Sequence, residues 1–421
     1  MMEFLEIKRD EYLKKLVARM RDGMAKLVTG MRGCGKTHLL FRIFKEHLLA
    51  HGVPGDHVIE ARLDLPQGQK LRDPQNFISY VKSRIKDQSC HFVLIDEVQM
   101  MEEFEPVLNY LLSLGILDVY ASGSNSSRLT SGVATEFRGR GEEIRVHPLS
   151  FSEFMGAYDG SAAEGWFEYC AFGGLPRVLS IKDPFGKAEY LRQLFEDEIL
   201  RGIRERCRIR DDGALHCVAT ALASSAGDLV NPLRLGRAIK GGTGRDISAY
   251  AIEKRLSCLE DAFIVSKAYR YDIKGRRRIG TPYKCYFEDT GLRNLGISMW
   301  KLDQTRLMEN ILHNELRLRG YRVEVGNIQK RAMNSDGSMG VRTLEVDFIA
   351  SRGSRRIYVQ SALSVQDADR MAEKKRPLME IGDSFSKIIV TKDSTLPMYD
   401  EDGIIFVNLF DFLLNKEPSL L

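Results

Sequence analysis

The stretch that decides the fold is KLVTGMRGCGKTHLLFRIF, residues 26–44. It contains the pattern G-x-x-x-x-G-K-[ST] from Gly30 to Thr37, between the strand-like AKLVTG and the helical THLLFRIFKEHLLA. A glycine-rich turn in this setting lets backbone N–H groups face a phosphate at the positive end of the helix dipole. Because a chance glycine-rich turn would lack this strand and helix, the pattern predicts a phosphate-binding loop in a parallel α/β sheet.

The residues of the loop have specific expected roles with ATP and Mg²⁺ as cofactors. Lys36 is expected to reach the β- and γ-phosphates, and the Thr37 hydroxyl is expected to ligate Mg²⁺. The residues expected to surround the nucleotide are Gly30, Gly33, Cys34, Gly35, Lys36, Thr37 and His38.

A second apolar run, CHFVLIDEVQ at residues 90–99, ends in two acids. Its continuous apolar character is typical of a central parallel strand that is buried on both faces. Ligands of open α/β sheets bind at the carboxyl ends of the strands, so Asp96 and Glu97 are expected beside the phosphate loop. We expect Asp96 to hold the magnesium shell and Glu97 to polarise the attacking water, which predicts an enzyme that hydrolyses ATP.

Two further segments offer polar groups to the same site. The run GILDVYASGSNSSRL at 115–129 ends in Ser124 and Asn125, either of which can bond the γ-phosphate or the lytic water; a plain turn explains them equally well. The segment TEFRGRGEEIRVHPLSFSEF at 135–154 contains Arg138 and Arg140. They are either arginine fingers that act on a neighbouring subunit of a homo-oligomer or a solvated surface pair.

Composition sets the limits of the interpretation. A chain of 421 residues with 43% hydrophobic and 29% charged residues is expected to form two to four globular domains. No apolar run reaches the roughly 20 residues of a membrane span, and the first residues have no secretory apolar core, so no membrane contact and a cytoplasmic location are expected. The seven scattered cysteines lack a C-x-x-C spacing, which predicts reduced thiols and neither a disulfide framework nor a zinc site.

The middle of the chain, residues 211–290, is expected to form three helices followed by a hairpin. In the third helix Ile252, Leu256 and Leu259 form a buried stripe, which leaves Lys254 off that stripe. The hairpin carries the basic turn DIKGRRR, expected to form a wing with Arg276, Arg277 and Arg278. This pattern favours a winged helix that binds double-stranded DNA. The alternative is a module that only positions the ATPase or packs against another subunit.

The C-terminal third combines a helix, LMENILHNELRLRGYRVEV at 307–325, with two strands, LEVDFIASRGSRRIYVQSAL at 344–363. Their order, with Glu309 on the helix and Asp347 on the first strand, resembles the PD-(D/E)XK nuclease core. The resemblance implies that both acids bind a metal ion. Gln360 and Ala362 stand where that core has a second-strand acid and a lysine, and this loss of charge favours a degenerate nuclease domain, although Glu345 can partly compensate as a ligand.

Beyond single motifs, the chain resembles AAA+ type ATPases of bacteria and archaea that carry a C-terminal nuclease-like domain. The resemblance rests on TGMRGCGKTHLL, LIDEVQ, SGSNS, FGGLPRVL, YKCYFEDTGLRN and EVDFIA, and covers nearly the whole chain. The expected fold class is α/β. Its expected parts are a P-loop parallel-sheet ATPase core at 1–150, a helical lid and linker at 151–210, a winged-helix-like domain at 211–290, and a restriction-endonuclease-like domain at 291–421.

The predicted function is Mg²⁺-dependent ATP hydrolysis coupled to DNA binding or to the remodelling of an assembly. Two alternatives stay open at this point. One is an ATP-switched signalling or scaffold protein that does not bind nucleic acid, and the other is an ATP-gated, metal-dependent DNA nuclease.

Overall fold

The computed structural model describes residues 7–124, 141–209, 211–297, 302–333, 338–365, 368–393 and 399–415. The chain divides into two compact units. The N-terminal unit comprises Met1–Pro148, Leu175–Arg177 and Asp261–Phe263, and the C-terminal unit comprises Leu149–Gly174, Val178–Glu260 and Ile264–Leu421. Within the described residues, no helix combines the length and the apolar character needed to cross a membrane.

The N-terminal unit is built on a five-stranded, all-parallel sheet with the order β2-β3-β4-β1-β5. Its strands are β1 (Ala25–Thr29), β2 (Val58–Arg62), β3 (His91–Asp96), β4 (Leu117–Gly123) and β5 (Gly141–Arg145). Every residue of β1, β3 and β4 is buried, and for β3 its continuous apolar run predicts this. In β1 and β4 the buried residues include Lys26 and Asp118, which form an ion pair with each other. The predicted parallel α/β core is confirmed.

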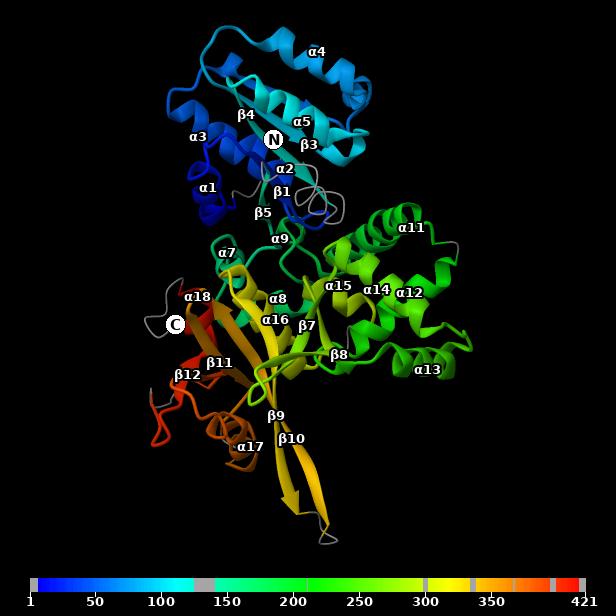
Figure 1. Ribbon diagram of the computed structural model, residues 1–421, viewed down its shortest axis with the longest axis vertical. Helices are drawn as coiled ribbons and strands as arrows, with labels where there is room; N and C mark the ends of the chain where they lie inside the picture. Colours follow the sequence, from blue (N-terminus) through cyan, green and yellow to red (C-terminus); the bar gives the residue numbers. More distant parts are fainter. Residues whose placement is uncertain are drawn as a thin grey trace. The chain divides into compact units, whose positions relative to one another are not determined.

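Helices cover both faces of this sheet (Figure 1). They are α1 (Asp10–Val17), α2 (Lys36–His38), α3 (Lys45–Ala50), α4 (Pro74–Arg84) and α5 (Phe104–Ser113), and a π-helical turn at Leu39–Phe44 makes α2 and α3 one continuous helix. On one face Phe77 of α4 and Leu108 of α5 join a core cluster that contains Val93 of β3. On the other face the ring of Phe44 lies 4.5 Å from that of Tyr120.

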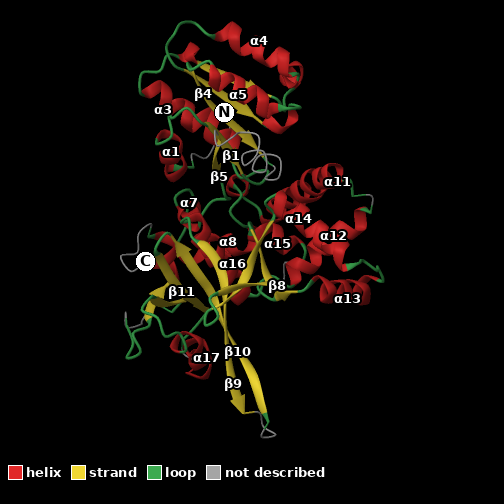
Figure 2. Ribbon diagram, in the orientation of Figure 1, coloured by secondary structure: helices red, strands yellow, loops and turns green. Residues whose placement is uncertain are grey.

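The C-terminal unit contains an eight-stranded mixed sheet with the order β13-β12-β11-β10-β9-β7-β8-β6. Its strands are drawn in yellow in Figure 2. The strands are β6 (Leu229–Val230), β7 (Val265–Asp272), β8 (Arg277–Phe287), β9 (Arg322–Met333), β10 (Met339–Arg352), β11 (Arg355–Ala362), β12 (Ser386–Thr391) and β13 (Ile405–Asn408). The hairpin β7–β8 joins the rest through a parallel pairing of β7 with β9. One sheet therefore continues across residue 290, where the sequence predicts a domain boundary, and the division into four domains stays a prediction.

Twelve α-helices are present among the described residues from 149 onward. They are α7 (Phe151–Met155), α8 (Ala162–Phe172), α9 (Pro176–Ser180), α10 (Pro184–Gln193), α11 (Arg201–Cys207), α12 (Asp212–Ser224), α13 (Pro232–Thr243), α14 (Ala249–Asp261), α15 (Thr290–Leu295), α16 (Gln304–Leu318), α17 (Ala368–Met379) and α18 (Leu409–Leu414). A π-helical turn at Leu194–Leu200 links α10 to α11. The predicted stripe of α14 is buried through Ile252, Leu256 and Leu259. A winged-helix arrangement of α12, α13, α14 and the β7–β8 hairpin remains a prediction.

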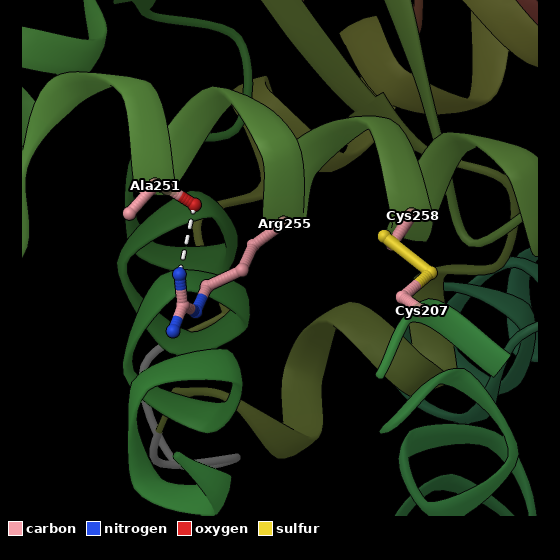
Figure 3. Close-up of a disulfide and its surroundings, with 4 residues drawn as sticks. All are labelled: Cys207, Ala251, Arg255 and Cys258. Atoms are coloured by element: carbon pink, nitrogen blue, oxygen red, sulfur yellow. Dashed lines mark hydrogen bonds between the residues drawn. A yellow bond between two sulfur atoms is a disulfide. The ribbon is translucent and has the colours of Figure 1, made fainter. Parts of the chain in front are cut away.

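The expectation that all seven cysteines are reduced is wrong for two of them. Cys207 at the end of α11 and Cys258 in α14 form a disulfide, with their Cα atoms 6.6 Å apart (Figure 3). The other five cysteines are free thiols. The two partners are separated by 51 residues in the sequence, so only the packing of α11 against α14 brings them together, and no spacing pattern indicates the pair.

Candidate active site

The phosphate loop lies between β1 and α2, and its glycines have backbone conformations that other residues rarely adopt. Gly30 has φ +148°, and a Cβ atom there would lie 2.2 Å from the carbonyl oxygen of Val146. Gly33 and Gly35 have φ values of +85° and +99°. A side chain at these positions would strain the turn or block it. The glycine spacing therefore reflects a geometric requirement of the loop.

Lys36 lies at the first position of α2 and is buried. Its ammonium donates hydrogen bonds to the carbonyl oxygens of Gly30, at 2.8 Å, and of Met31, at 2.9 Å. The charge is thus held against the loop by two carbonyl groups, which a phosphate oxygen can replace as acceptors. Cys34 faces inward, with its thiol 3.5 Å from the carbonyl oxygen of Val146, whereas His38 is exposed.

Thr37 and Asp96 come together at the carboxyl ends of β1 and β3. The Thr37 hydroxyl donates to Asp96 Oδ2 at 2.8 Å, and the hydroxyl of Ser122 from β4 donates to Asp96 Oδ1. Burial raises the pKa of the Asp96 carboxyl, and these two hydrogen bonds oppose the rise. A hydroxyl and a carboxylate this close are hard oxygen donors that suit Mg²⁺, so the residues fit the expected ion.

Glu97 follows Asp96 with φ +52°. This conformation turns its carboxylate to Ser124, whose hydroxyl donates to Glu97 Oε2 at 3.1 Å, and to the side-chain amide of Gln99, which donates to the same oxygen. The backbone N–H of Glu97 donates to Ser122 Oγ at 3.3 Å. The carboxylate is therefore held in place by the segments that follow two neighbouring strands, with Gln99 after β3 and Ser124 after β4.

Two pairs of the predicted residues are in contact, Thr37 with Asp96 and Glu97 with Ser124. The ammonium of Lys36 lies in the phosphate loop of the same unit. Ser124 contacts Glu97. The sequence instead suggested for Ser124 a contact with the γ-phosphate or the lytic water. The candidates Asn125, Arg138 and Arg140 lie outside the described residues. Ser122 and Gln99 are the supporting residues that the sequence reasoning missed. Their only signal was a polar residue within three positions of a strand end.

The predicted metal-binding acids of the C-terminal unit have cations as partners. Lys284 of β8 places its ammonium 2.9 Å from Glu309 Oε1 and 2.6 Å from Glu345 Oε1. Lys374 of α17 lies 3.0 Å from Asp347 Oδ2. We call these five residues the acid–lysine network. The sequence reasoning missed both lysines, because they come from elements outside the helix-strand-strand motif.

Hydrogen bonds complete the acid–lysine network. The Tyr286 hydroxyl donates to Glu309 at 2.6 Å, and the backbone N–H and hydroxyl of Ser361 each donate to Asp347 Oδ2 at 2.8 Å. Gln360, at the position of the missing acid, accepts from the backbone N–H of Asp347 at 3.0 Å and donates to the carbonyl oxygens of Glu345 and Lys374 at 3.2 and 3.3 Å. It therefore ties β11 to β10 and α17.

The charges of this network compensate one another. Burial raises the pKa of Glu309, whereas for Asp347 the effect of burial is outweighed by Lys374, Lys284 and Ser361, which lower its pKa. Burial alone would lower the pKa values of Lys284 and Lys374, but the neighbouring carboxylates raise both. Ammonium groups thus occupy the positions next to the acids that a metal ion would need. These residues do not fit a Mg²⁺ site as they are arranged.

The predicted DNA-contacting residues lie on two elements of the C-terminal unit. Lys254 is exposed on α14, and Arg276, Arg277 and Arg278 are exposed at the β7–β8 turn. Arg278 is partly engaged, because it donates to Glu324 Oε1 at 2.9 Å and its guanidinium lies 4.7 Å from the ring centre of Tyr269. Arg277 lies 4.0 Å from Asp272 Oδ2 with most of its side chain exposed, and Arg276 is exposed on the same turn.

Two parts of the chain match known family models. Residues 22–155 match the family model of the AAA domain. The match supports the predicted P-loop core of the AAA+ ATPase type and the binding of a nucleotide. Residues 163–303 match a domain of unknown function (DUF8612), which assigns no activity. The nuclease-like and winged-helix assignments therefore remain predictions.

Two relatives match most of the chain. An uncharacterized protein of Haemophilus influenzae is 29% identical over 416 residues, which cover 97% of this chain and 98% of the relative. The uncharacterized protein MJ1544 of Methanocaldococcus jannaschii is 23% identical over 364 residues, 83% of this chain and 77% of the relative. Among solved structures, the ORC1 protein of Aeropyrum pernix in complex with DNA aligns with 75% of this chain and 95% of its own, at 10% identity and a TM-score of 0.32. This structural similarity is too low to support a conclusion.

Proposed function

We propose that this protein hydrolyses ATP with Mg²⁺ and uses the reaction to change how DNA, or a neighbouring copy of the chain, is held. The observation that supports the ATPase proposal is the arrangement at the carboxyl ends of β1 and β3. There Thr37 contacts Asp96 at 2.8 Å, and Glu97 follows directly with its carboxylate held by Ser124.

The residues of the chain have separate roles in this proposal. The loop amides and Lys36 bind the phosphates, and Lys36 exchanges its two carbonyl acceptors for phosphate oxygens. When bound, Mg²⁺ supplies positive charge that offsets the charge developing on the γ-phosphate. Thr37 and Asp96 would hold it, and Ser122 fixes the orientation of Asp96. Glu97 accepts a proton from the attacking water, for which Ser124 and Gln99 orient its carboxylate.

The test separates nucleotide binding from turnover. Lys36→Ala is expected to abolish binding of a fluorescent ATP analogue, whereas Glu97→Gln should bind it as the wild type does and lose ATP hydrolysis. A matched control is Glu102→Gln, because Glu102 is an exposed acid only five positions from Glu97. Hydrolysis by Glu97→Gln at the wild-type rate would contradict the role of Glu97.

The acid–lysine network supports the interpretation that the C-terminal unit is not a nuclease. Its three carboxylates are engaged by two ammonium groups and by hydroxyl and amide donors. Metal-dependent cleavage needs carboxylates that are free to bind the ion. We propose that this part of the fold serves as a platform for binding or assembly. Plasmid and branched DNA should stay intact when they are incubated with the wild-type protein and Mg²⁺ or Mn²⁺. Cleavage by the wild type that is absent in Asp347→Ala would overturn this proposal.

A further inference from the structure

The strands β9 and β10 form an arm that runs past the rest of their sheet (Figure 1). Their last pair buried in the core is Ile328 with Leu344. Five register pairs continue beyond it, from Gln329 with Thr343 to Met333 with Met339. At about 3.4 Å per residue these pairs form a two-stranded ribbon roughly 15 Å long. We call the described residues 328–330 and 338–344 of this ribbon the arm.

The arm has one basic side and one side of mixed character. Lys330 and Arg342 stand directly opposite each other in the register, so their side chains share the same face. The other face carries Gln329 and Thr343 and, toward the tip, Val341, which is 64% exposed. Met339, on the same face, is 68% exposed. Two exposed apolar side chains and two neighbouring cations make this surface suited to a partner that offers both apolar and negatively charged groups.

The β7–β8 turn at residues 272–277, together with its partner Glu380, forms what we call the foot of the arm, and it adds further positive charge. The backbone N–H of Ile273, in the β7–β8 turn, donates to the carbonyl oxygen of Asn327 at 3.0 Å, which fixes this turn against β9. Lys274 and Lys330 then share one acid, Glu380, at 4.0 and 2.5 Å. Arg276 and Arg277 are exposed on the same turn. Five cations, Lys274, Arg276, Arg277, Lys330 and Arg342, thus stand against two acids, Glu380 and Asp272, and the formal charge of foot and arm is +3.

We propose that the arm inserts into the major groove of duplex DNA, with the basic foot on the phosphates beside it. The major groove of B-form DNA is about 12 Å wide and about 8.5 Å deep and admits a two-stranded ribbon. An amide, a hydroxyl and aliphatic side chains on one face suit base edges and the thymine methyl group, and the cations suit the phosphates. This inference rests on the DNA-binding part of the proposed function. It assigns the contact to β9 and β10, whereas the sequence assigns it to a winged-helix recognition helix.

The experiment measures binding of the full chain, with ATP and Mg²⁺, to a labelled DNA duplex of about 30 base pairs and to an RNA duplex of the same sequence, between about 0.05 and about 0.3 M salt. For Lys330→Gln with Arg342→Gln, two lost phosphate contacts should reduce the slope of log affinity against log salt by about 1.8 and weaken binding roughly 10- to 60-fold at about 0.1 M salt. Lys182→Gln with Arg192→Gln is the matched control. It removes two exposed charges elsewhere in the C-terminal unit and should bind as the wild type does.

A second variant tests insertion into the groove without removing a cation. Val341→Asp removes no cation but would bring a carboxylate to the base edges, and it should weaken DNA binding about tenfold. The melting temperature of each variant shows whether it folds, and wild-type values are expected because all three positions are exposed. RNA should bind weakly, because its major groove is too deep and narrow for a ribbon.

The outcomes distinguish the two proposals. If both arm variants bind DNA as the wild type does, the proposal that the arm contacts DNA is wrong, whereas the proposal that the protein binds DNA is unaffected. Equal binding of RNA and DNA would overturn insertion into the major groove. Absence of duplex binding by the wild type would overturn both DNA proposals, and the hydrolysis assay on Glu97→Gln would still decide the ATPase proposal.

Discussion

Replacing Lys284 by methionine tests whether the acid–lysine network is a closed structural element. Lys284 is buried on β8 between Glu309 and Glu345, with side-chain exposures of 5%, 11% and 37%. Removing one partner of a buried ion pair costs about 3–5 kcal/mol, because the remaining charge is left uncompensated. In a large unit each kcal/mol lowers the melting temperature by about 2 °C, so Lys284→Met should melt roughly 6–10 °C below the wild type at pH 7.

The loss of stability in Lys284→Met is expected to depend on pH, and the pKa shifts of Lys284 and Glu309 give the direction. The pKa of Lys284 is raised above its ordinary value of 10.5, so its stabilising contribution is fully present at neutral pH. Burial raises the pKa of Glu309, and Lys284 is the main group that lowers it again. Without Lys284 the folded state favours protonated Glu309. The deficit in the free energy of unfolding should therefore shrink as the pH falls from about 7 to about 5.

The assay is thermal unfolding followed by circular dichroism at both pH values. The control is Lys240→Met, since Lys240 forms an ion pair with Asp246 in which the side chains are 59% and 74% exposed. It should cost no more than about 0.5 kcal/mol. Adding Glu309→Gln to Lys284→Met should recover a large part of the loss. Equal melting temperatures for Lys284→Met and the wild type at pH 7 would refute the reasoning.

The remaining predictions concern the nucleotide site and the disulfide. Ser122→Ala removes a hydroxyl donor from Asp96 and should lower the rate of ATP hydrolysis about tenfold in a steady-state assay, since a hydrogen bond to a charged group contributes about 1.5–3 kcal/mol; an unchanged rate would show that Asp96 needs no such support. Gly30→Ala places a Cβ atom 2.2 Å from the Val146 carbonyl oxygen and should abolish binding of an ATP analogue by equilibrium titration. Tight binding by this variant would mean that the loop adapts. Cys207→Ser opens a loop of 51 residues closed by the disulfide and should lose about 4 kcal/mol of stability in chemical unfolding, an effect that dithiothreitol should reproduce in the wild type. A wild type insensitive to the reductant would contradict it.

The ATPase core was predictable because its signals are local. A strand, a glycine loop and a helix follow one another between residues 26 and 44, and the acids of β3 follow directly on their apolar run. The rule that ligands bind at the carboxyl ends of parallel strands then brings Asp96 to Thr37 without further information. Hydrogen bonds across strands, such as that from Ser122 to Asp96, depend on which strands are neighbours, and the sequence does not state this.

The C-terminal unit was harder to predict because its features depend on contacts between distant segments. The loss of charge at Gln360 and Ala362 was visible, and it indicated a poor catalyst. The pairing of the three acids with Lys374 and Lys284 was not visible, because α17 and β8 reach the acids only after the sheet has formed. The cysteine pair has the same origin, since two helices must pack before Cys207 meets Cys258.

The pairing of β7 with β9 has a consequence for how this protein can be dissected and how it evolved. Backbone hydrogen bonds join these strands in parallel, through Arg270 with Val325 and the two pairs after it. Cutting the chain near residue 290 would give two fragments, one with β7 and the other with β9 as a new edge strand. Each new edge would expose unpaired N–H and C=O groups, which promote aggregation. Neither half is then a transferable module, so recombination at this point would be selected against, and deletion studies should keep residues 264–415 in one piece.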